Sequence, residues 1–276
     1  MSYGTSRRSF LGAAALLAAK STTAASAPSS GAIRLGLCSY SFGKSKLSEA
    51  LPAFALAGIR YINIKPEFHL PYDSSPAQIA ETRKMLDDHG LILAGTGATY
   101  LTKPDMGEIR QRFDFNKALG SPLIVIGPTA ETLPLIEKCV KEYDIQVAVH
   151  NHGPSDKHFP TPQSALAVIK NMDPRVGLCM DIGHTMRSGV NPVEAARVAG
   201  ARLLDLHTKD VKKVDGKWVS ADCGDGDIDL PAFFRQLKAQ GFKGVGNLEY
   251  EVSGPGRDVG IQRSLSYLKG IDATLA

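Results

Sequence analysis

The sequence predicts a single-domain α/β protein with a (β/α)8 TIM barrel fold, and three observations support this. Short apolar runs of four to six residues alternate with longer amphipathic stretches from residue 33 almost to the end of the 276-residue chain. Strict alternation of strands and helices implies a parallel sheet. Eight repeats in about 245 residues match the number and length at which such a sheet closes into a barrel.

Most predicted strands are apolar runs that end at a polar residue or a glycine. The eight predicted strands span residues 33–38, 61–65, 91–95, 123–126, 146–150, 176–181, 203–207 and 244–249. The predicted helices span residues 47–57, 76–89, 106–119, 131–143, 161–171, 192–199, 230–240 and 258–270. Their ends carry helix signals, which are the cap-proline pairs Ser75-Pro76, Thr161-Pro162 and Asn191-Pro192 and the terminal glycines Gly58, Gly90, Gly120 and Gly241.

A doubly wound open sheet is the alternative fold. It would use Gly95-Thr96-Gly97 as a dinucleotide-binding turn. That turn lacks the third glycine, and the next predicted strand runs into Gly127 where an acidic ribose ligand would be needed. The barrel is therefore the better prediction, and it places functional residues at the carboxyl ends of its strands.

The amino terminus resembles a twin-arginine export signal. Arg7 and Arg8 precede an apolar, alanine-rich run at residues 12–19, and small residues at 25–27 form a cleavage site. The twin-arginine pattern usually has lysine where this chain has Gly12. We predict a signal peptide at residues 1–27, a linker at 28–32, a barrel at 33–276, and a periplasmic or secreted protein. A membrane anchor is the alternative, but the run is shorter than the roughly 20 residues of a spanning helix.

Charge and cysteine content exclude several classes of protein. The formal net charge is +4, and three of the positive charges precede residue 28, which leaves about +1 on the rest of the chain. Without a lysine or arginine run, we expect no nucleic-acid partner and, after signal cleavage, no membrane partner. The four cysteines form no CxxC pair, which argues against a zinc ribbon.

Four consecutive predicted strands end in metal-ligating residue types. They are His150, Asp181, His207 and Glu249. A single strand-end histidine is more often structural, and a single aspartate often caps a helix. Four together at one barrel mouth would leave charges unpaired unless a cation were bound. Two imidazoles and two carboxylates suit one divalent metal ion such as Mn²⁺, Zn²⁺, Co²⁺ or Fe²⁺.

The strand ends also resemble a known family. The segments MDIGH at residues 180–184, LHTKD at 206–210 and NLEYE at 247–251 are similar to motifs of the xylose isomerase-like TIM barrels. This sugar phosphate isomerase/epimerase superfamily includes ketose 3-epimerases and inosose dehydratases. The loop GDGDID at residues 224–229 is similar to another family motif. The resemblance covers most of the chain after the signal.

The resemblance implies a ligand set and an activity. Metal ligands fall on Asp181, His207 and Glu249, with the fourth on the fifth strand. There the family usually has glutamate before Asn-His-Gly, whereas this chain has His150. In the epimerases, the two strand-end glutamates exchange a proton on the two faces of a carbon beside a carbonyl. His150 can still bind the metal ion, but it lacks the negative charge of the glutamate. An isomerisation or β-elimination that needs only one base is therefore an alternative to epimerisation by two glutamates.

Further residues are predicted to serve the site. The candidate catalytic groups are Glu249, His150, His152 and Lys209. Lys209 shares a strand face with His207, although it could instead be solvated or paired with Asp210. The candidate substrate-binding residues are Lys65, Glu67 and His69 after the second strand, and His184, which could instead support a ligand through a hydrogen bond.

The predicted function is a divalent-metal-dependent sugar isomerase or epimerase that acts at a carbon next to a carbonyl of a sugar, keto-sugar or polyol. Its partner is then a small-molecule sugar substrate. The alternatives are a keto-glycoside or inosose lyase or dehydratase, and a non-catalytic periplasmic sugar-binding barrel. Metal-assisted phosphodiester cleavage is a weaker alternative because the chain has no basic groove signature. The sequence leaves open whether the chain forms a homo-oligomer.

Overall fold

A computed structural model describes Met1 and residues 33–275, so the expected linker and all of the expected signal peptide except Met1 lie outside the described residues. Eight strands form a closed barrel in the order β1-β10-β7-β6-β5-β4-β3-β2, and every neighbouring pair whose register is given is parallel. The predicted (β/α)8 barrel is confirmed. Its strands are β1 (Arg34–Cys38), β2 (Tyr61–Ile64), β3 (Ile92–Leu101), β4 (Leu123–Pro128), β5 (Gln146–His150), β6 (Val176–Asp181), β7 (Leu203–Thr208) and β10 (Val245–Leu248).

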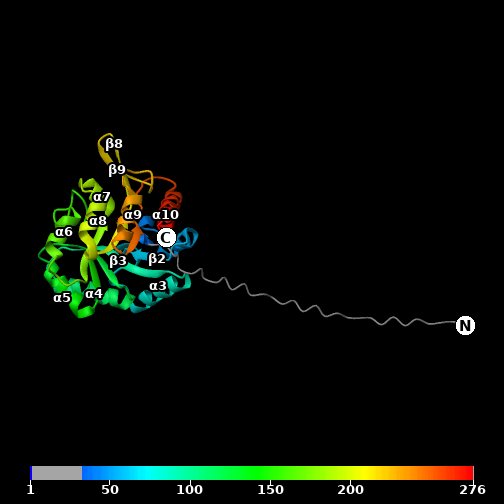
Figure 1. Cartoon of the computed structure of the whole chain (residues 1–276). Helices are drawn as coiled ribbons and strands as arrows, with labels where there is room; N and C mark the ends of the chain where they lie inside the picture. The colour runs from blue at the N-terminus through cyan, green and yellow to red at the C-terminus, as the bar shows by residue number, and fades with distance from the viewer. Residues whose placement is uncertain (2–32, 276) are drawn as a thin grey trace. The chain divides into compact units, whose positions relative to one another are not determined.

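Helices surround the barrel (Figure 1). They are α1 (Leu47–Ala57), α2 (Pro66–His69), α3 (Pro76–Asp88), α4 (Met106–Leu119), α5 (Leu133–Tyr143), α6 (Pro162–Ile169), α7 (Ile182–Arg187), α8 (Pro192–Ala199), α9 (Leu230–Ala239) and α10 (Arg257–Ala273). The expected caps form, because the side chains of Ser75, Thr161 and Asn191 each accept a backbone N–H from the first turn that follows.

Among the elements that differ from the sequence prediction are a longer strand, a short helix and a hairpin. Strand β3 has ten residues where five were expected, because Thr99 and Tyr100, which favour strands, continue its pairing with β4. The six-residue helix α7 is too short for a periodic pattern to reveal. Strands β8 (Asp210–Val214) and β9 (Lys217–Ala221) form a hairpin whose turn is Asp215-Gly216, with both φ angles positive.

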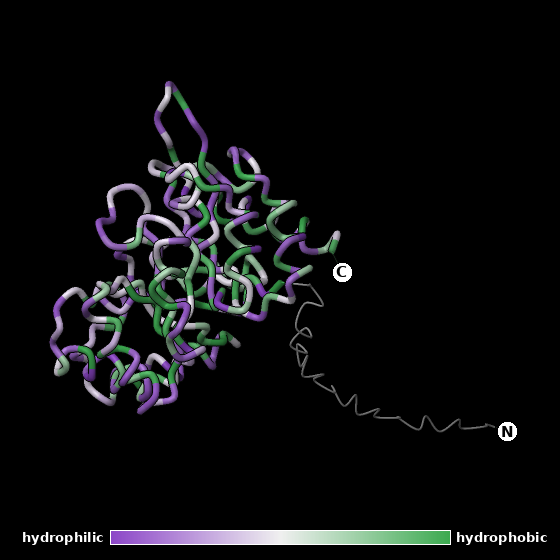
Figure 2. Tube along the Cα trace, turned by 60° about the vertical axis from the view of Figure 1, so that its left-hand side comes forward, coloured by the Kyte–Doolittle hydropathy of each residue, from purple (hydrophilic) through white to green (hydrophobic). Residues whose placement is uncertain are grey.

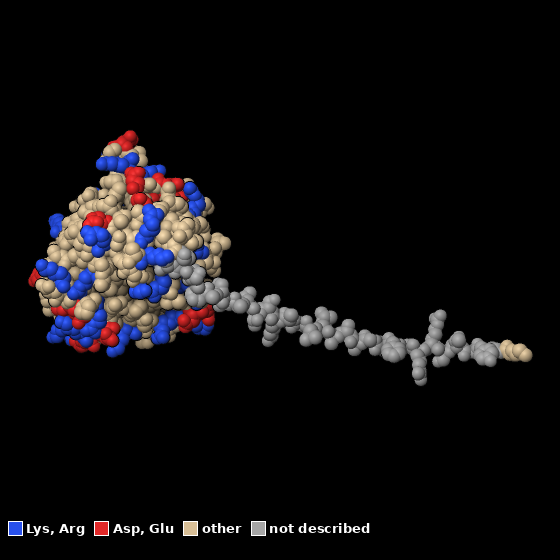
Figure 3. Space-filling model, in the orientation of Figure 1, with Lys and Arg blue, Asp and Glu red and all other residues tan. Residues whose placement is uncertain are grey.

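The core lies mainly between the barrel and its helices. Phe54, Phe113, Phe233 and Phe234 are fully buried there, and apolar stretches dominate the inner part of the chain trace in Figure 2. Lysine, arginine and acidic side chains are interspersed over the visible face in Figure 3, as expected from the low net charge. Among the described residues, no helix combines the length and apolar character needed to cross a membrane.

Candidate metal centre and active site

The carboxyl ends of four adjacent strands bring the predicted metal ligands together. His150 ends β5, Asp181 ends β6, His207 lies near the end of β7, and Glu249 follows β10. The register aligns Asp181 with His207, so both side chains enter the barrel mouth at the same level. One ligand atom from each of the four residues lies within 4.8 Å of every other. Residues separated by 99 positions in sequence therefore form one cluster.

The cluster fits a divalent cation. His150, Asp181 and His207 are at most 4% exposed. Within the described part of the chain, both ring nitrogens of His150 and of His207 lack a hydrogen-bond partner. Buried polar atoms without partners are costly, and imidazole nitrogens beside carboxylates are typical ligands of borderline divalent ions. Burial lowers the pKa of His150 to about 4, which keeps its ring neutral and able to donate a lone pair.

Lys209 already places one positive charge in this cluster. Its ammonium nitrogen lies 2.9 Å from Asp181 Oδ2, 2.7 Å from Glu249 Oε2 and 2.9 Å from Glu251 Oε1. Burial opposes the charged form, but these three carboxylates hold the pKa of Lys209 above its ordinary value. Three carboxylates outnumber the positive charges of Lys209 and of Arg187, which lies 3.6 Å from Glu251, so the cluster keeps a net negative charge that favours a cation.

Asp181 also organises the chain next to the cluster. Its carboxylate accepts the backbone N–H of His184 at 2.7 Å and so caps α7. The Asn151 side chain accepts the Asp181 N–H at 3.1 Å and donates to the Asp181 carbonyl oxygen at 3.3 Å. Asp181 can therefore cap α7 and also contribute to the cluster, because one carboxylate oxygen faces the helix and the other faces the cluster.

Four histidine rings line the mouth. The ring centroids of His150 and His207 are 4.7 Å apart, those of His152 and His184 are 4.5 Å apart, and those of His150 and His152 are 5.6 Å apart. The structure thus brings His152 and His184 beside the ligand cluster, as the sequence predicted. Burial lowers the pKa of His184 to about 4, which makes its ring neutral.

The three candidate residues after β2 are held by protein contacts. Lys65 donates to the Ala98 carbonyl oxygen, and its ammonium lies 3.6 Å from Glu67. Glu67 accepts the Thr99 hydroxyl at 2.7 Å. His69 Nδ1 lies 2.9 Å from the Ser39 hydroxyl. Their predicted contact with substrate stays a prediction.

Sequence reasoning missed three residues that the structure places at the mouth. Tyr100 lies between two candidates, with Lys65 5.8 Å above its ring and the His152 ring 6.0 Å away. Glu251 binds Lys209, and Arg187 lies 3.6 Å from Glu251. Tyr100 belongs to the unexpected extension of β3. Glu251 lies two residues past Glu249 in the NLEYE motif, where alternation could have signalled it.

Asp210 does not pair with Lys209, which excludes that alternative for the lysine. Its carboxylate accepts the backbone N–H groups of Gly224, Gly226 and Ile228 at 3.0 to 3.2 Å. The segment GDGDID is therefore a loop pinned to the barrel by one buried carboxylate. Its last residue, Asp229, caps α9 by accepting the N–H of Ala232.

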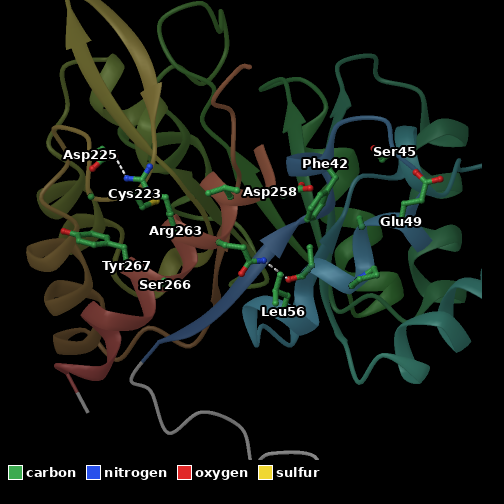
Figure 4. A pocket seen from close by; sticks show the side chains of 16 residues that line it. Phe42, Ser45, Glu49, Leu56, Cys223, Asp225, Asp258, Arg263, Ser266 and Tyr267 are labelled. Carbon is green, nitrogen blue, oxygen red and sulfur yellow. Dashed lines mark hydrogen bonds and ion pairs between the residues drawn. The ribbon is translucent and has the colours of Figure 1, made fainter. Parts of the chain in front are cut away.

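A sizeable groove lies away from the ligand cluster. It has a volume of about 940 Å³ and lies between α1 and α10, where Phe42, Leu56, Arg263 and Tyr267 contribute to its lining (Figure 4). None of the four candidate metal ligands lines it. The groove and the cluster of candidate ligands are therefore separate features of the barrel.

The chain folds as a parallel α/β barrel, and residues 51–271 match the sequence profile of the family described as "Xylose isomerase-like TIM barrel". The chain belongs to that family. An uncharacterized protein of Bacillus subtilis, YfiH, is 26% identical over 162 residues, which are 50% of this chain and 51% of YfiH. The match thus spans about half the length of this curated relative.

Solved structures show the same fold. An uncharacterized protein from Parabacteroides distasonis is 25% identical, with a TM-score of 0.68 over 87% of this chain and 99% of its own. The IOLI protein with a bound zinc atom is 20% identical, with a TM-score of 0.73 over 88% and 99%. The 3-keto-D-glucoside 4-epimerase YcjR from E. coli is 16% identical, with a TM-score of 0.72 over 86% and 99%.

Proposed function

We propose that this protein is a divalent-metal-dependent enzyme that moves a proton at a carbon next to a carbonyl of a sugar, keto-sugar or related polyol. The observation that carries the proposal is the convergence of His150, Asp181, His207 and Glu249 within 4.8 Å at the barrel mouth. A bound divalent ion would act as a Lewis acid on the carbonyl and the neighbouring hydroxyl and so acidify the C–H between them. Family membership supports this reaction class.

The chain offers His152 as the base. Glu249 is a candidate metal ligand, and its carboxylate lies 2.7 Å from the Lys209 ammonium, so it is a weak base. His150 is buried among the ligands. His152 lies in the loop after β5, is partly exposed, and has its ring 5.6 Å from that of His150. It can therefore meet a substrate carbon above the ligand cluster.

Lys209 is suited to stabilise negative charge on a substrate oxygen. Its ammonium is buried and reaches the ligand carboxylates, where an oxygen of the substrate would be close to the cluster. His184, beside His152, can hold a hydroxyl of the same substrate, and Tyr100, Lys65, Glu67 and His69 form the neighbouring wall. In this assignment, the side chains orient the sugar and the base removes one proton.

The test is carbon-bound deuterium. The metal-loaded protein is incubated in D₂O with ketoses, inososes and 3-keto-glycosides, and each sugar is examined by NMR for exchange beside its carbonyl. His152→Gln should lower the exchange rate about 100-fold or more, since general base catalysis contributes about 10²–10⁴-fold. His158→Gln, an exposed histidine of the same loop, is the matched control. If no sugar exchanges or is consumed, while one binds, the non-catalytic sugar-binding alternative replaces the proposal.

A lyase is the second candidate, and His150 favours it. With histidine in place of the strand-five glutamate, one face of the substrate lacks a carboxylate base, and β-elimination needs only one base. A keto-glycoside lyase would release its aglycone, and an inosose dehydratase would release water. Product analysis of the same incubations separates elimination from isomerisation, because only elimination yields an unsaturated product.

We further propose that the chain is exported to the periplasm, or secreted, by its twin-arginine signal. The support is the sequence of residues 1–27, which lies outside the described residues. Cell fractionation tests it. Substitution of both Arg7 and Arg8 by lysine should leave the full-length precursor in the cytoplasm, and export of the doubly substituted chain would contradict the proposal.

A further inference from the structure

A second group of donor side chains lies one layer below the barrel mouth. Alternation along a strand points residues 179 and 181 of β6, and residues 205 and 207 of β7, to the same side. The register pairs Cys179 with Asp205 and Asp181 with His207. Cys179 and Asp205 therefore form a layer inside the barrel, beneath the ligand cluster. One donor atom each of Cys179, Asp205 and His207 lies within 4.8 Å of the others.

The carboxylate of this inner layer is oriented by its neighbours. Asn247 donates its side-chain amide to Asp205 Oδ1 at 2.9 Å, which leaves Oδ2 facing the Cys179 sulfur at 3.6 Å. Metal–sulfur and metal–oxygen bonds of about 2.3 and 2.0 Å at a tetrahedral angle would place the two atoms about 3.5 Å apart. These three side chains are the donors whose atoms lie mutually close, and all three are buried.

Unpartnered atoms indicate that this layer accommodates a further group. The Cys179 thiol donates a hydrogen bond to Asp205 Oδ2 across this 3.6 Å separation, which still leaves the imidazole of His207 without a partner. In the described part of the barrel, His207 Nε2, Asn247 Oδ1 and both polar side-chain atoms of Asn63 have no hydrogen-bond partner, and all three residues are at most 1% exposed. His207 Nδ1 lies 3.2 Å from Glu249 in the mouth, which leaves Nε2 for the inner layer.

We propose that Cys179, Asp205 and His207 bind a second metal ion, a thiophilic divalent cation of the Zn²⁺ type. When both sites are filled, His207 would bridge them as an imidazolate, with Nδ1 toward the mouth and Nε2 toward the inner ion, and its ring proton would be released to solvent as the second ion binds. A divalent ion with the Cys179 thiolate and the Asp205 carboxylate has no net charge before the shared imidazolate is counted, which reduces the cost of burying it. The proposal goes beyond the proposed enzymatic function and does not require it.

The inner ion differs from the mouth ion in its ligands, and Co²⁺ reports that difference. A thiolate ligand gives Co²⁺ a sulfur-to-metal charge-transfer absorption in the near ultraviolet, whereas the mouth has only nitrogen and oxygen donors. The chain is produced in Co²⁺-supplemented medium, so that the buried position fills as the protein folds. We expect two Co²⁺ ions per chain together with the charge-transfer band.

Substitutions assign each ion to its site. Cys179→Ser and Asp205→Asn should each remove one ion and abolish the band, whereas Asp181→Asn should remove one ion and keep the band. His207→Ala should remove both. Cys139→Ser replaces a buried cysteine on α5, next to Met106, and serves as the matched control with both ions retained.

Several outcomes would overturn the inner site. They are a single Co²⁺ ion without the band in the unsubstituted chain, or a band that persists in Cys179→Ser. If Cys179→Ser fails to fold, Asp205→Asn, which keeps the size of the side chain, makes the same test. If the unsubstituted chain holds only one Co²⁺ ion but shows the charge-transfer band, the inner site is present and the mouth site is empty. That result would contradict the proposed function and would leave the inner site standing.

Discussion

Replacement of Lys209 by methionine should strengthen metal binding at the mouth. The ammonium lies 2.9 and 2.7 Å from the Asp181 and Glu249 oxygens that a metal ion would need. Two unit charges about 4 Å apart interact by about 4 kcal/mol at an effective dielectric constant of about 20, so an ion of charge +2 would be repelled by about 8 kcal/mol if the lysine stayed. Movement toward Glu251, its third partner, offsets most of this repulsion.

A residual repulsion of only about 1.4 kcal/mol corresponds to a tenfold change in affinity. We therefore expect Lys209→Met to bind Zn²⁺ or Mn²⁺ at least tenfold more tightly in calorimetric titration. The metal-free variant should also be less stable, by about 3–5 kcal/mol, because the loss of one partner leaves buried carboxylates uncompensated. The gain in Tm on adding metal should then exceed that of the unsubstituted chain.

Lys213→Met is the matched control, since Lys213 lies on the hairpin over the Trp218 ring and away from the cluster. Equal or weaker metal binding by Lys209→Met, with the fold retained, would refute the competition between the lysine and the ion. It would show instead that the lysine and the metal ion bind together, with Lys209 held by Glu251 alone.

Three other predictions follow from the same contacts. Asp181→Asn should weaken metal binding at the mouth about 100-fold or more while the chain stays folded, as metal analysis and circular dichroism would show, whereas Asp225→Asn, on the surface, should not. Burial lowers the pKa values of His150 and His184 from 6.5 to about 4, so the unfolded chain binds more protons between these values. The stability of the metal-free protein should therefore fall as pH drops from 6.5 to 4, by up to about 3 kcal/mol per histidine, and a flat unfolding midpoint across this window would contradict the assignment. Asp210→Ala should lower the free energy of unfolding by about 2–4 kcal/mol, since it leaves several buried N–H groups unsatisfied, and limited proteolysis should then cut the loop at residues 222–229 faster.

Much of the fold and of the mouth could be predicted from sequence because both depend on periodicity. Apolar runs mark the strands, and in a parallel barrel all carboxyl ends meet on one side. His150, Asp181, His207 and Glu249 were therefore identifiable as neighbours before any coordinates were known. The bounds of α1, α4 and α8 were predicted without error because caps, prolines or glycines mark their ends.

Other features depend on distances between side chains, which the periodicity of the sequence does not give. Alternation put Lys209 on the same strand face as His207, but only the structure shows its ammonium reaching three carboxylates. The inner layer was missed because Cys179 and Asp205 lie within strands that read as apolar, and a buried cysteine usually behaves as a small hydrophobic residue. The Asp215-Gly216 turn of the hairpin did carry a sequence signal, which was overlooked.

His150 stands where the family usually has glutamate, and this difference changes the charge around Lys209. With histidine on strand five, Asp181, Glu249 and Glu251 supply three negative charges and Lys209 supplies one positive charge. The guanidinium of Arg187, 3.6 Å from Glu251, balances that carboxylate, so Asp181, Glu249 and Lys209 leave a net charge of −1 at the candidate ligands. A glutamate at position 150 would make this charge −2 and would attract both cations more strongly. The neutral imidazole of His150 therefore leaves too few negative charges to hold Lys209 and a divalent ion equally well, which is why the two are expected to compete for Asp181 and Glu249.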